Sequence, residues 1–564
     1  MQLIAITMKQ MKGWSRGSER LLLTLTVMLS LSVSVWQPAE ARDGDLDTTF
    51  GNGGITNILF GSEIGDSAGS TATAVALQPD GKIVAVGQDY QRVLVARFNA
   101  DGSRDAGFGV DGTIISSVGD SYAADIAVQS DGKIIVLWSG DGRAFKLTRY
   151  NSDGTLDADF GINGTVTTDF GNSRPSTDQP SAMAIQSDGR IIVVGGTYET
   201  INLYDIYRFA IARYNSNGSL DTSFDTDGKV LTPASSDYFY RFAYDVLIQP
   251  DGKIVAAGVG YMDNISGYSV VRYNTDGSLD NSFGSGGMVV TGFSTGRLDC
   301  VSALQLQSDG KIVAVGNVGD VDFAVVRYNT NGSLDTSFGT GGKFISSLGP
   351  RYFMHSFGGA IQADGKILVS GAPSGRFGIA RLTKDGRLDT SFGDGGKVAA
   401  PAGGAHAIVI QPDGKIVAAG GVPVGASGSF AVVRYANRNL LEVTMTGDTV
   451  DAGDGKTSLR EAINAANALG IPQTITFNIP SADAGFDGTT YTIQVLSPLP
   501  IITANGTSID GTTQSGFSSR PIIELDGQAA GAGANGLHIN AANCEVYGLT
   551  VNGFAANGVW ISGA

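Results

Sequence analysis

One phrase recurs seven times between Leu46 and Tyr435, and this repetition constrains the fold more than any single residue. Each copy contains an L-D-x-x-F phrase, an apolar run that closes in Q-x-D-G-[KR]-I, and a strand-like run that ends in Arg plus an apolar or aromatic residue. The D-G turns run from Asp80 to Asp413, so six steps cover 413 − 80 = 333 residues and the mean period is 55.5 residues. A period near fifty is typical of a propeller or a solenoid.

The local signals within one copy all predict β-strands. Residues 74–78 and 82–87 are apolar runs on either side of a D-G dipeptide, which supplies the positive φ angles of a tight hairpin. A third strand is predicted at 323–328 and its equivalents, and a fourth after each L-D-x-x-F phrase, as at 229–231. Runs that are apolar on both faces indicate sheets covered on both sides. The sequence therefore predicts an all-β fold with a seven-bladed β-propeller over residues 42–438.

The two ends of the repeat array are complementary. The first copy begins with a fourth strand, predicted at Gly54–Phe60, whereas the last copy stops after its third strand at Tyr435. An open ring would leave two unpaired strand edges. We therefore expect Gly54–Phe60 to complete the seventh blade by pairing with Phe430–Tyr435.

An Arg and an Asp recur in every copy and could line a site. One pair per blade at equivalent positions favours a structural role instead, in which the Arg bridges to the Asp and the Phe is wedged between blades. The Asp and Phe residues are Asp47/Phe50, Asp105/Phe108, Asp157/Phe160, Asp221/Phe224, Asp280/Phe283, Asp335/Phe338 and Asp389/Phe392. The Arg residues are Arg97, Arg149, Arg213, Arg272, Arg327, Arg381 and Arg434.

The loops before the L-D-x-x-F phrases contain several oxygen-bearing side chains. The loop Asn274–Asp280 resembles an oxygen-rich Ca²⁺ loop. Asx side chains that bond their own backbone in turns are the simpler explanation. We therefore predict no metal, cofactor or catalytic residues.

The segments 332–343 (G-S-L-D-T-S-F-G-T-G-G-K) and 307–316 (Q-S-D-G-K-I-V-A-V-G) resemble the delta-60 repeat of large bacterial secreted and surface proteins. The resemblance covers residues 44–436 and implies a propeller on a surface protein, without catalytic residues. The second copy departs most from the pattern, with Arg104 in place of Leu and Leu137-Trp138-Ser139 in place of the usual Gly.

The first 41 residues have the pattern of a signal peptide. Four basic residues precede the apolar stretch 21–35, and Ala39-Glu40-Ala41 is an A-x-A cleavage site. The stretch is short for a membrane span and contains Ser and Thr. Removal of 1–41 takes away four basic and two acidic residues, so the net charge becomes −16 − 4 + 2 = −18. We expect a secreted or cell-surface protein that does not bind nucleic acid or anionic membranes.

Cysteine and histidine are too scarce and too scattered for several kinds of site. Cys300 and Cys544 lie in different predicted domains, so we expect two separate buried thiols and no disulfide framework. The three histidines, His355, His406 and His538, form no metal-binding or triad pattern. The sequence therefore argues against zinc sites and His-dependent catalysis.

Residues 439–564 follow a different pattern. The segment 457–467 (T-S-L-R-E-A-I-N-A-A-N) has an apolar stripe at helical spacing, and Gly470-Ile471-Pro472 ends the helix. Short predicted strands follow at 474–477, 491–495, 508–511, 521–525, 537–539, 544–551 and 559–561. Asn535-Gly536 and Asn557-Gly558 are 22 residues apart, which is about one rung of a parallel β-helix.

The segment 457–467 is similar to the C-S-L-R-E-A segment that opens right-handed parallel β-helices in secreted bacterial proteins. Thr457 replaces the Cys and is compatible with capping the helix. Arg460 and Glu461 are expected to be solvated or locally paired. The last residues, 557–564, form an apolar strand without a cap, so we expect an incomplete domain and an exposed final rung.

Two functions from different classes fit these observations. The first is a non-enzymatic secreted or cell-surface protein that acts as an adhesion or interaction module for a protein or glycan ligand. The second is an enzyme or ligand-binding propeller whose channel mouth holds a metal or substrate, or a carbohydrate-active β-helix in a longer parent chain. A catalytic propeller concentrates unlike polar residues in a few blades, whereas this array repeats the same ones, which favours the first.

Overall fold

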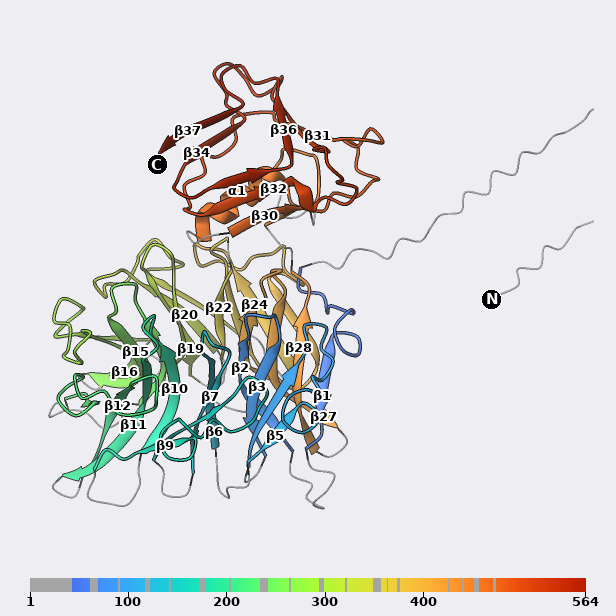
Figure 1. Cartoon of the computed structure of the whole chain (residues 1–564). Coiled ribbons are helices and arrows are strands. Elements are labelled where there is room, and N and C mark those ends of the chain that lie inside the picture. The colour runs from blue at the N-terminus through green and yellow to red at the C-terminus, as the bar shows by residue number, and fades with distance from the viewer. Residues whose placement is uncertain are drawn as a thin grey trace, which may run out of the picture. The chain divides into compact units, whose positions relative to one another are not determined.

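The computed structural model describes residues 43–60, 69–89, 92–116, 122–140, 144–171, 178–201, 204–233, 242–262, 265–293, 299–319, 322–347, 357–362, 364–372, 376–424, 427–437, 441–450, 456–469 and 473–563. The predicted signal peptide, 1–41, lies outside these residues. Residues 43–437 form seven four-stranded antiparallel sheets, which are the blades of a β-propeller (Figure 1). The predicted seven-bladed propeller is confirmed.

The blades follow one another in chain order, and within each of blades 1 to 6 the four strands are also in chain order. Blade 1 contains β2 (Thr71–Leu77), β3 (Ile83–Gln88), β4 (Val93–Phe98) and β5 (Thr113–Ile115). Blade 2 contains β6 (Tyr122–Val128), β7 (Ile134–Ser139), β8 (Phe145–Tyr150) and β9 (Thr165–Thr168). Blade 3 contains β10 (Gln179–Ile185), β11 (Ile191–Ile201), β12 (Tyr204–Tyr214) and β13 (Lys229–Leu231). Blade 4 contains β14 (Phe242–Ile248), β15 (Ile254–Met262), β16 (Ile265–Tyr273) and β17 (Met288–Gly292).

The remaining three blades complete the ring. Blade 5 contains β18 (Cys300–Leu306), β19 (Ile312–Val318), β20 (Asp322–Tyr328) and β21 (Lys343–Ser347). Blade 6 contains β22 (Gly359–Ile361), β23 (Ile367–Gly371), β24 (Arg376–Leu382) and β25 (Lys397–Ala402). Blade 7 contains β26 (Gly404–Ile410), β27 (Ile416–Val424), β28 (Ser427–Tyr435) and, as its fourth strand, β1 (Ile55–Ile58).

Blade 7 closes the ring as expected. β1 pairs antiparallel with β28, in the register Ile55↔Val433 to Ile58↔Phe430. In Figure 1 the blue β1 lies beside the orange β28. The N-terminal strand therefore supplies the hydrogen bonds that the last copy of the repeat lacks.

The D-G hairpins differ from the prediction in one detail. In the first of them only Gly81 has a positive φ, of 82°, and Asp80 does not. The Asp80 side chain instead accepts a hydrogen bond from the backbone N–H of Lys82, at 3.2 Å. The Asp thus stabilises the turn through its carboxylate, as Asx residues do.

The first strands of neighbouring blades contact each other around the ring and form its inner wall. Between blades, apolar side chains from two sheets make one core. Phe224 of blade 3, for example, packs with Val246 and Ile254 of blade 4. A Cβ on Gly277 of blade 4 would come within 3.1 Å of the Phe224 ring. The recurring Phe is therefore wedged between blades, as the sequence predicts.

Residues 441–563 contain one helix and nine short strands, among the residues that the structure describes. The elements are β29 (Glu442–Val443), α1 (Leu459–Leu469), β30 (Gln473–Phe477), β31 (Tyr491–Gln494), β32 (Thr507–Asp510), a 3₁₀ turn η2 (Gly511–Thr513), β33 (Ile523–Asp526), β34 (Leu537–Asn540), β35 (Glu545–Tyr547), β36 (Leu549–Asn552) and β37 (Val559–Gly563). All strand pairs in this segment are parallel, in the orders β29-β30-β32-β35, β31-β33-β36 and β34-β37. Their apolar residues share one core with α1.

The 22-residue spacing seen in the sequence separates two strands that pair in parallel. Leu537 of β34 pairs with Val559 of β37, and the side-chain amide of Asn557 donates to Asn535 at 3.0 Å. On β37, Trp560 stacks on His538 with ring centroids 4.1 Å apart and keeps 44% of its surface exposed.

Three details of this segment correct the sequence predictions. The predicted strand 544–551 is two strands, because the chain turns at Gly548 with φ 65° and a Cβ there would lie 2.7 Å from the backbone nitrogen of Thr512. β35 and β36 then join different sheets. Ser458, not Thr457, caps α1, since Ser458 and Glu461 exchange the two hydrogen bonds of a capping box. Cys544 is half-buried, not buried.

Arg460 is locally paired, as predicted. Its guanidinium makes two bonds to the Asp448 carboxylate, at 2.9 and 2.7 Å. Within the described residues, no helix is long and apolar enough to cross a membrane.

Candidate functional site

The residues that recur in every repeat meet at one end of the propeller. We call it the signature end, defined by the D-G hairpins between first and second strands and by the L-D-x-x-F-G loops between third and fourth strands. The opposite end, which we call the variable end, carries the connections from second to third strands and from each fourth strand to the next blade. Consecutive antiparallel strands alternate in direction, so the two kinds of connection fall at opposite ends.

Arg327 of blade 5 shows how the signature end is built. Its Nε donates to Asp335 at 2.7 Å, and its guanidinium lies 4.7 Å from the ring centroid of Phe338. Its terminal nitrogen donates to the backbone carbonyl of Lys384, in blade 6, at 2.6 Å. One side chain thus ties its own loop and the next blade together.

The same ion pair and cation–π contact occur in all seven blades. The Nε–carboxylate distance is 2.7 or 2.8 Å each time, and the guanidinium–ring distance is 4.4 to 4.7 Å. The pairs are Arg97–Asp105, Arg149–Asp157, Arg213–Asp221, Arg272–Asp280, Arg327–Asp335, Arg381–Asp389 and Arg434–Asp47. The predicted Arg–Asp bridge is confirmed in every blade.

The basic residue after each D-G turn is a second partner of the same Asp. Lys311, for example, lies 3.2 Å from Asp335. Burial acts to raise the pKa of Asp335, but hydrogen bonds from Ser337 and the charges of Lys311 and Arg327 outweigh it and hold the pKa well below its usual value. The pKa is lowered at all seven equivalent Asp residues. These carboxylates are ionised structural anchors.

Where blade 6 meets blade 7, the Arg has different partners from those in the other six blades. In six blades the Arg donates to a backbone carbonyl of the next blade, at Ser152, Ser216, Thr275, Thr330, Lys384 or Ala100. Arg381 of blade 6 instead bonds the Asn437 side chain and the Asp43 carboxylate, each at 2.9 Å. The N-terminal segment thus closes the network as well as the sheet.

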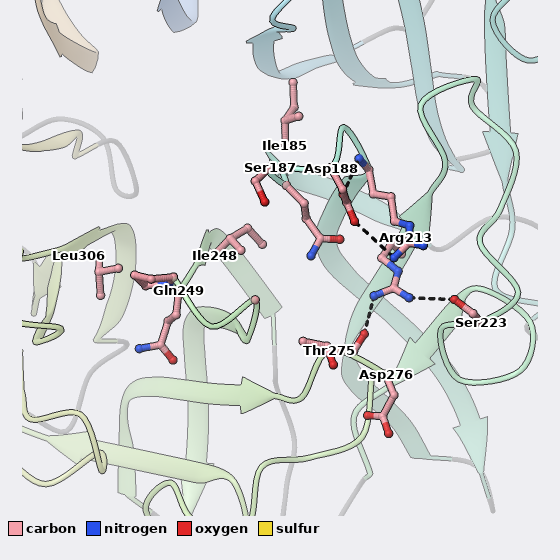
Figure 2. Close-up of a pocket in the computed structure, with 14 residues that line it drawn as sticks. Ile185, Ser187, Asp188, Arg213, Ser223, Ile248, Gln249, Thr275, Asp276 and Leu306 are labelled. Carbon is pink, nitrogen blue, oxygen red and sulfur yellow. Dashed lines mark hydrogen bonds and ion pairs between the residues drawn. The ribbon is translucent and has the colours of Figure 1, made fainter. Parts of the chain in front are cut away.

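A cleft of about 720 Å³ lies at the signature end, between the hairpins of blades 3 and 4 (Figure 2). Figure 2 shows Arg213 between Ser223 and Thr275, to which it is hydrogen-bonded. In five other blades the recurring Gln bonds the Arg, but no donor among the described residues reaches the Oε1 of Gln186. The charge of Arg213 is already balanced by Asp221, so Arg213 is not a free charged anchor for a ligand in the cleft.

Two carboxylates break the symmetry of the inner wall. Asp125 of β6 and Asp245 of β14 occupy a position where four other inner strands carry Ala74, Ala182, Ala303 and Ala407. Asp125 accepts the backbone N–H groups of Ile126 and Met183, both at 2.8 Å. Asp245 accepts those of Val246, at 2.7 Å, and Leu304, at 2.6 Å. Each therefore bridges its blade to the next.

Both carboxylates are poised near neutral pH. Although part of each residue's surface remains accessible, burial of the carboxylate raises the pKa of Asp125 to about 6 and that of Asp245 to about 7. The charge of Asp125 adds to the rise at Asp245. Perturbed carboxylates of this kind are candidate acid–base groups.

Four aromatic rings are in contact at the variable end of blades 3 and 4; we call them the aromatic track. Tyr198 of β11 and Tyr207 of β12 are cross-strand partners with centroids 5.1 Å apart. Tyr207 lies 5.9 Å from Phe242, the first residue of β14, and Phe242 stacks on Tyr244 at 6.1 Å. All four residues are partly exposed. The track thus joins the longest hairpin of the propeller to the inner wall.

The loop that resembles a Ca²⁺ loop is held by its own hydrogen bonds. Asp276 accepts from the N–H and the hydroxyl of Ser278, at 3.0 and 2.6 Å, and Asn274 donates to Ser278 Oγ at 2.9 Å. These bonds fit the Asx-turn interpretation. Within the described ranges, no three His, Cys, Asp or Glu side chains lie close enough together to hold a metal ion.

Asp125, Asp245 and the aromatic track are candidate site residues that the sequence patterns do not predict. A signal for the two carboxylates was present, because aligning the seven copies places Asp where most have Ala. The track had no such signal, since its residues come from two copies and meet only when neighbouring blades pack.

Comparison with solved structures finds weak similarity to several propellers. A virginiamycin B lyase from Staphylococcus aureus is 12% identical with a TM-score of 0.39, over 67% of this chain and 98% of that one. A gluconolactonase from Xanthomonas campestris is 14% identical with a TM-score of 0.32, over 58% and 92%. The polysaccharide lyase Uly1 is 12% identical with a TM-score of 0.36, over 70% and 96%. At such low scores these similarities say nothing about the activity of this chain.

No curated protein sequence matches the chain. One family model does, and its description is a domain of unknown function (DUF5122) beta-propeller. It matches seven segments, residues 78–108, 129–160, 186–224, 249–283, 307–338, 362–392 and 411–437. Each segment begins at the recurring Gln of one copy, so the match follows the repeat that builds the blades.

Proposed function

We propose that this chain is a non-enzymatic secreted or cell-surface protein whose propeller acts as an adhesion or interaction module. One observation supports the proposal most. The repeated polar side chains pair with one another in the signature-end network of every blade, whereas partly exposed aromatic residues that differ from blade to blade lie at the variable end. Binding through the variable end would leave the network that holds the ring untouched.

The N-terminal pattern supports export. Residues 1–41 combine a basic segment, an apolar stretch and an A-x-A site, and we infer cleavage after Ala41. Expression in a bacterial host, with N-terminal sequencing of the exported protein, tests this inference. A mature chain that begins at Arg42 would support it, and a chain retained in the cytoplasm with its first residues intact would contradict it.

We further infer that the repeat is of the delta-60 type and that residues 439–564 are the start of a right-handed parallel β-helix of the CSLREA type. The parallel strand pairs and the shared apolar core of this segment support the inference. The stacked pair Ile475 and Ile509, continued by Val546, is the kind of ladder that such a solenoid uses.

A screen with chain 42–564 tests the main proposal. The immobilised protein would be presented with glycan arrays and with extracts of surface proteins, beside a variant that carries Tyr198→Ala and Tyr207→Ala. A ligand that binds the natural protein and not the variant supports an interaction module. Equal binding of a ligand by both proteins would show that the ligand binds at a surface other than the one formed by Tyr198 and Tyr207.

A carbohydrate-active propeller is the second candidate, and the inner-wall carboxylates favour it. Asp125 and Asp245 have raised pKa values, and the charge of Asp125 adds to the rise at Asp245, which suits groups that exchange protons with a substrate. Turnover of a polysaccharide by the natural chain, lost in Asp245→Ala, would select this alternative.

A further inference from the structure

We propose that the aromatic track, Tyr198, Tyr207, Phe242 and Tyr244, binds a neutral oligosaccharide. This inference rests on the proposed interaction function and names its ligand class. The track lies on the variable end, where it does not compete with the signature-end network.

The chemistry of the four side chains fits a sugar better than a purely apolar ligand. The face of an aromatic ring is electron-rich, so it attracts the polarised C–H bonds on the flat face of a pyranose ring. Tyr198 and Tyr207 carry hydroxyl groups that add donors and acceptors beside the apolar ring faces, whereas burial raises the pKa of the Tyr244 hydroxyl, so Tyr244 contributes mainly its ring. Rings placed side by side can engage consecutive sugar units.

The backbone is adapted to hold these rings in place. Gly196 of β11 has no side chain where Phe242 packs, and a Cβ there would lie 2.5 Å from the ring. At the matching place between blades 7 and 1, Gly421 faces the Thr71 side chain instead of an aromatic ring. Of these two glycine positions, the one at Gly196 accommodates an aromatic ring and the one at Gly421 does not.

The length of the hairpin also sets this place apart. β11 and β12 have 11 residues each, against 9 each for the hairpins of blades 4 and 7 and 6 each for β3 and β4 of blade 1. The Tyr198↔Tyr207 pair belongs to the added length. The core between blades needs no residues beyond the end of the shorter hairpins. Phe209, which is fully buried, already completes that core.

Charge narrows the class of glycan. The chain carries a formal net charge of −16, which repels polyanions at moderate salt. None of the four side chains is cationic. The track therefore favours neutral gluco-, xylo- or manno-oligosaccharides over uronic acid polymers.

Calorimetric titration of chain 42–564 with neutral oligosaccharides of four to six sugars, roughly the reach of a short subsite row, tests the proposal. Oligogalacturonate is the anionic comparison. We expect one of the neutral series to bind and Tyr207→Ala to weaken it by about tenfold or more. Tyr207→Phe keeps the ring and loses the hydroxyl, so its loss should be smaller.

Tyr122→Ala is the matched control. Tyr122 is the first residue of the inner strand β6, as Phe242 is of β14, but it is 60% exposed and has no ring partner among the described residues. Its removal should change the affinity by less than about twofold. Phe242→Thr, which installs the residue of blade 1, is a second way to remove the track if Tyr207→Ala lowers the melting temperature.

Three outcomes would overturn the proposal. The first is that no neutral oligosaccharide binds, and the second is that binding survives both Tyr207→Ala and Phe242→Thr. The third is capture of a protein partner that depends on Tyr207 while the sugars fail, which would reject the glycan and leave the interaction function standing. If no ligand of any kind, glycan or protein, binds at the variable end, the proposed interaction function is rejected as well.

Discussion

The two ends of the propeller obey different rules. At the signature end the Arg, Asp, Phe and basic residues of the repeat make the same contacts in all seven blades, with one substitution at the seam. At the variable end, hairpin lengths and side chains differ from blade to blade, and aromatic rings and carboxylates occur in some blades only. In a ring of equivalent units, repeated contacts hold the units together, and departures from the repeat are free to serve function.

The largest effect is expected when the ring is opened by removing the N-terminal strand and its signature-end Asp. A chain that starts at residue 61 lacks β1 and Asp47, so blade 7 loses its fourth strand and Arg434 loses its carboxylate partner. We expect a lower melting temperature and self-association through the exposed edge of β28. Calorimetry and light scattering, with a chain starting at Asp43 as the control, measure both effects. A monomer that melts like the control would contradict the closure.

Acid should weaken the signature end as a whole. The pKa of each of its seven Asp residues is lowered in the folded protein, so their stabilising contribution is present above the unfolded value, near 3.8, and is lost as the pH falls below it. Asp125 and Asp245 have the opposite sign, because their raised pKa values cost stability progressively as the pH rises from the unfolded value near 3.8 to about 6 and about 7. The free energy of unfolding in urea should therefore be highest at about pH 4. Stability that rises steadily down to pH 3 would refute this assignment.

Breaking a single signature-end contact should cost less but still be clear. Arg327→Ala leaves the buried Asp335 without its main partner, and removal of one member of a buried ion pair costs about 3–5 kcal/mol. Arg104→Ala is the control, since Arg104 is 47% exposed and its pair with Asp111 should contribute about 1 kcal/mol or less. Chemical denaturation compares the two. Unchanged stability with lost ligand binding in Arg327→Ala would move the network into a binding site.

The smallest effect is expected at the inner wall. Asp245→Ala installs the residue that four other blades carry, so the fold should persist with a loss of about 1–2 kcal/mol at pH 5 from the missing N–H acceptor. The dependence of the unfolding free energy on pH between about 4 and about 7 should become shallower, because the raised pKa is removed. A pH profile identical to that of the natural protein would show that Asp245 does not titrate in this range.

Sequence reasoning was most accurate where residues repeat. The bridge from Arg327 to Asp335 could be predicted because the same pair recurs seven times and a ring demands one contact per blade. It failed at Gly548, where one predicted strand is two, because a single glycine with positive φ redirects the chain between sheets. It also assigned the helix cap to Thr457, although the neighbouring Ser458 has the spacing to Glu461 that a capping box needs.

The number of blades, the closure of the ring and the contacts of the signature end could all be predicted from the repeat. These follow from a fixed period and from strand edges that must pair. Two features are visible in the tertiary structure alone: burial raises the pKa of Asp125 and Asp245, and Tyr207 of one blade meets Phe242 of the next. The two carboxylates share one position in the aligned copies, but neither their burial nor the ring contact can be read from that alignment. Both depend on how neighbouring blades pack and on the length of each hairpin, and a linear pattern encodes neither.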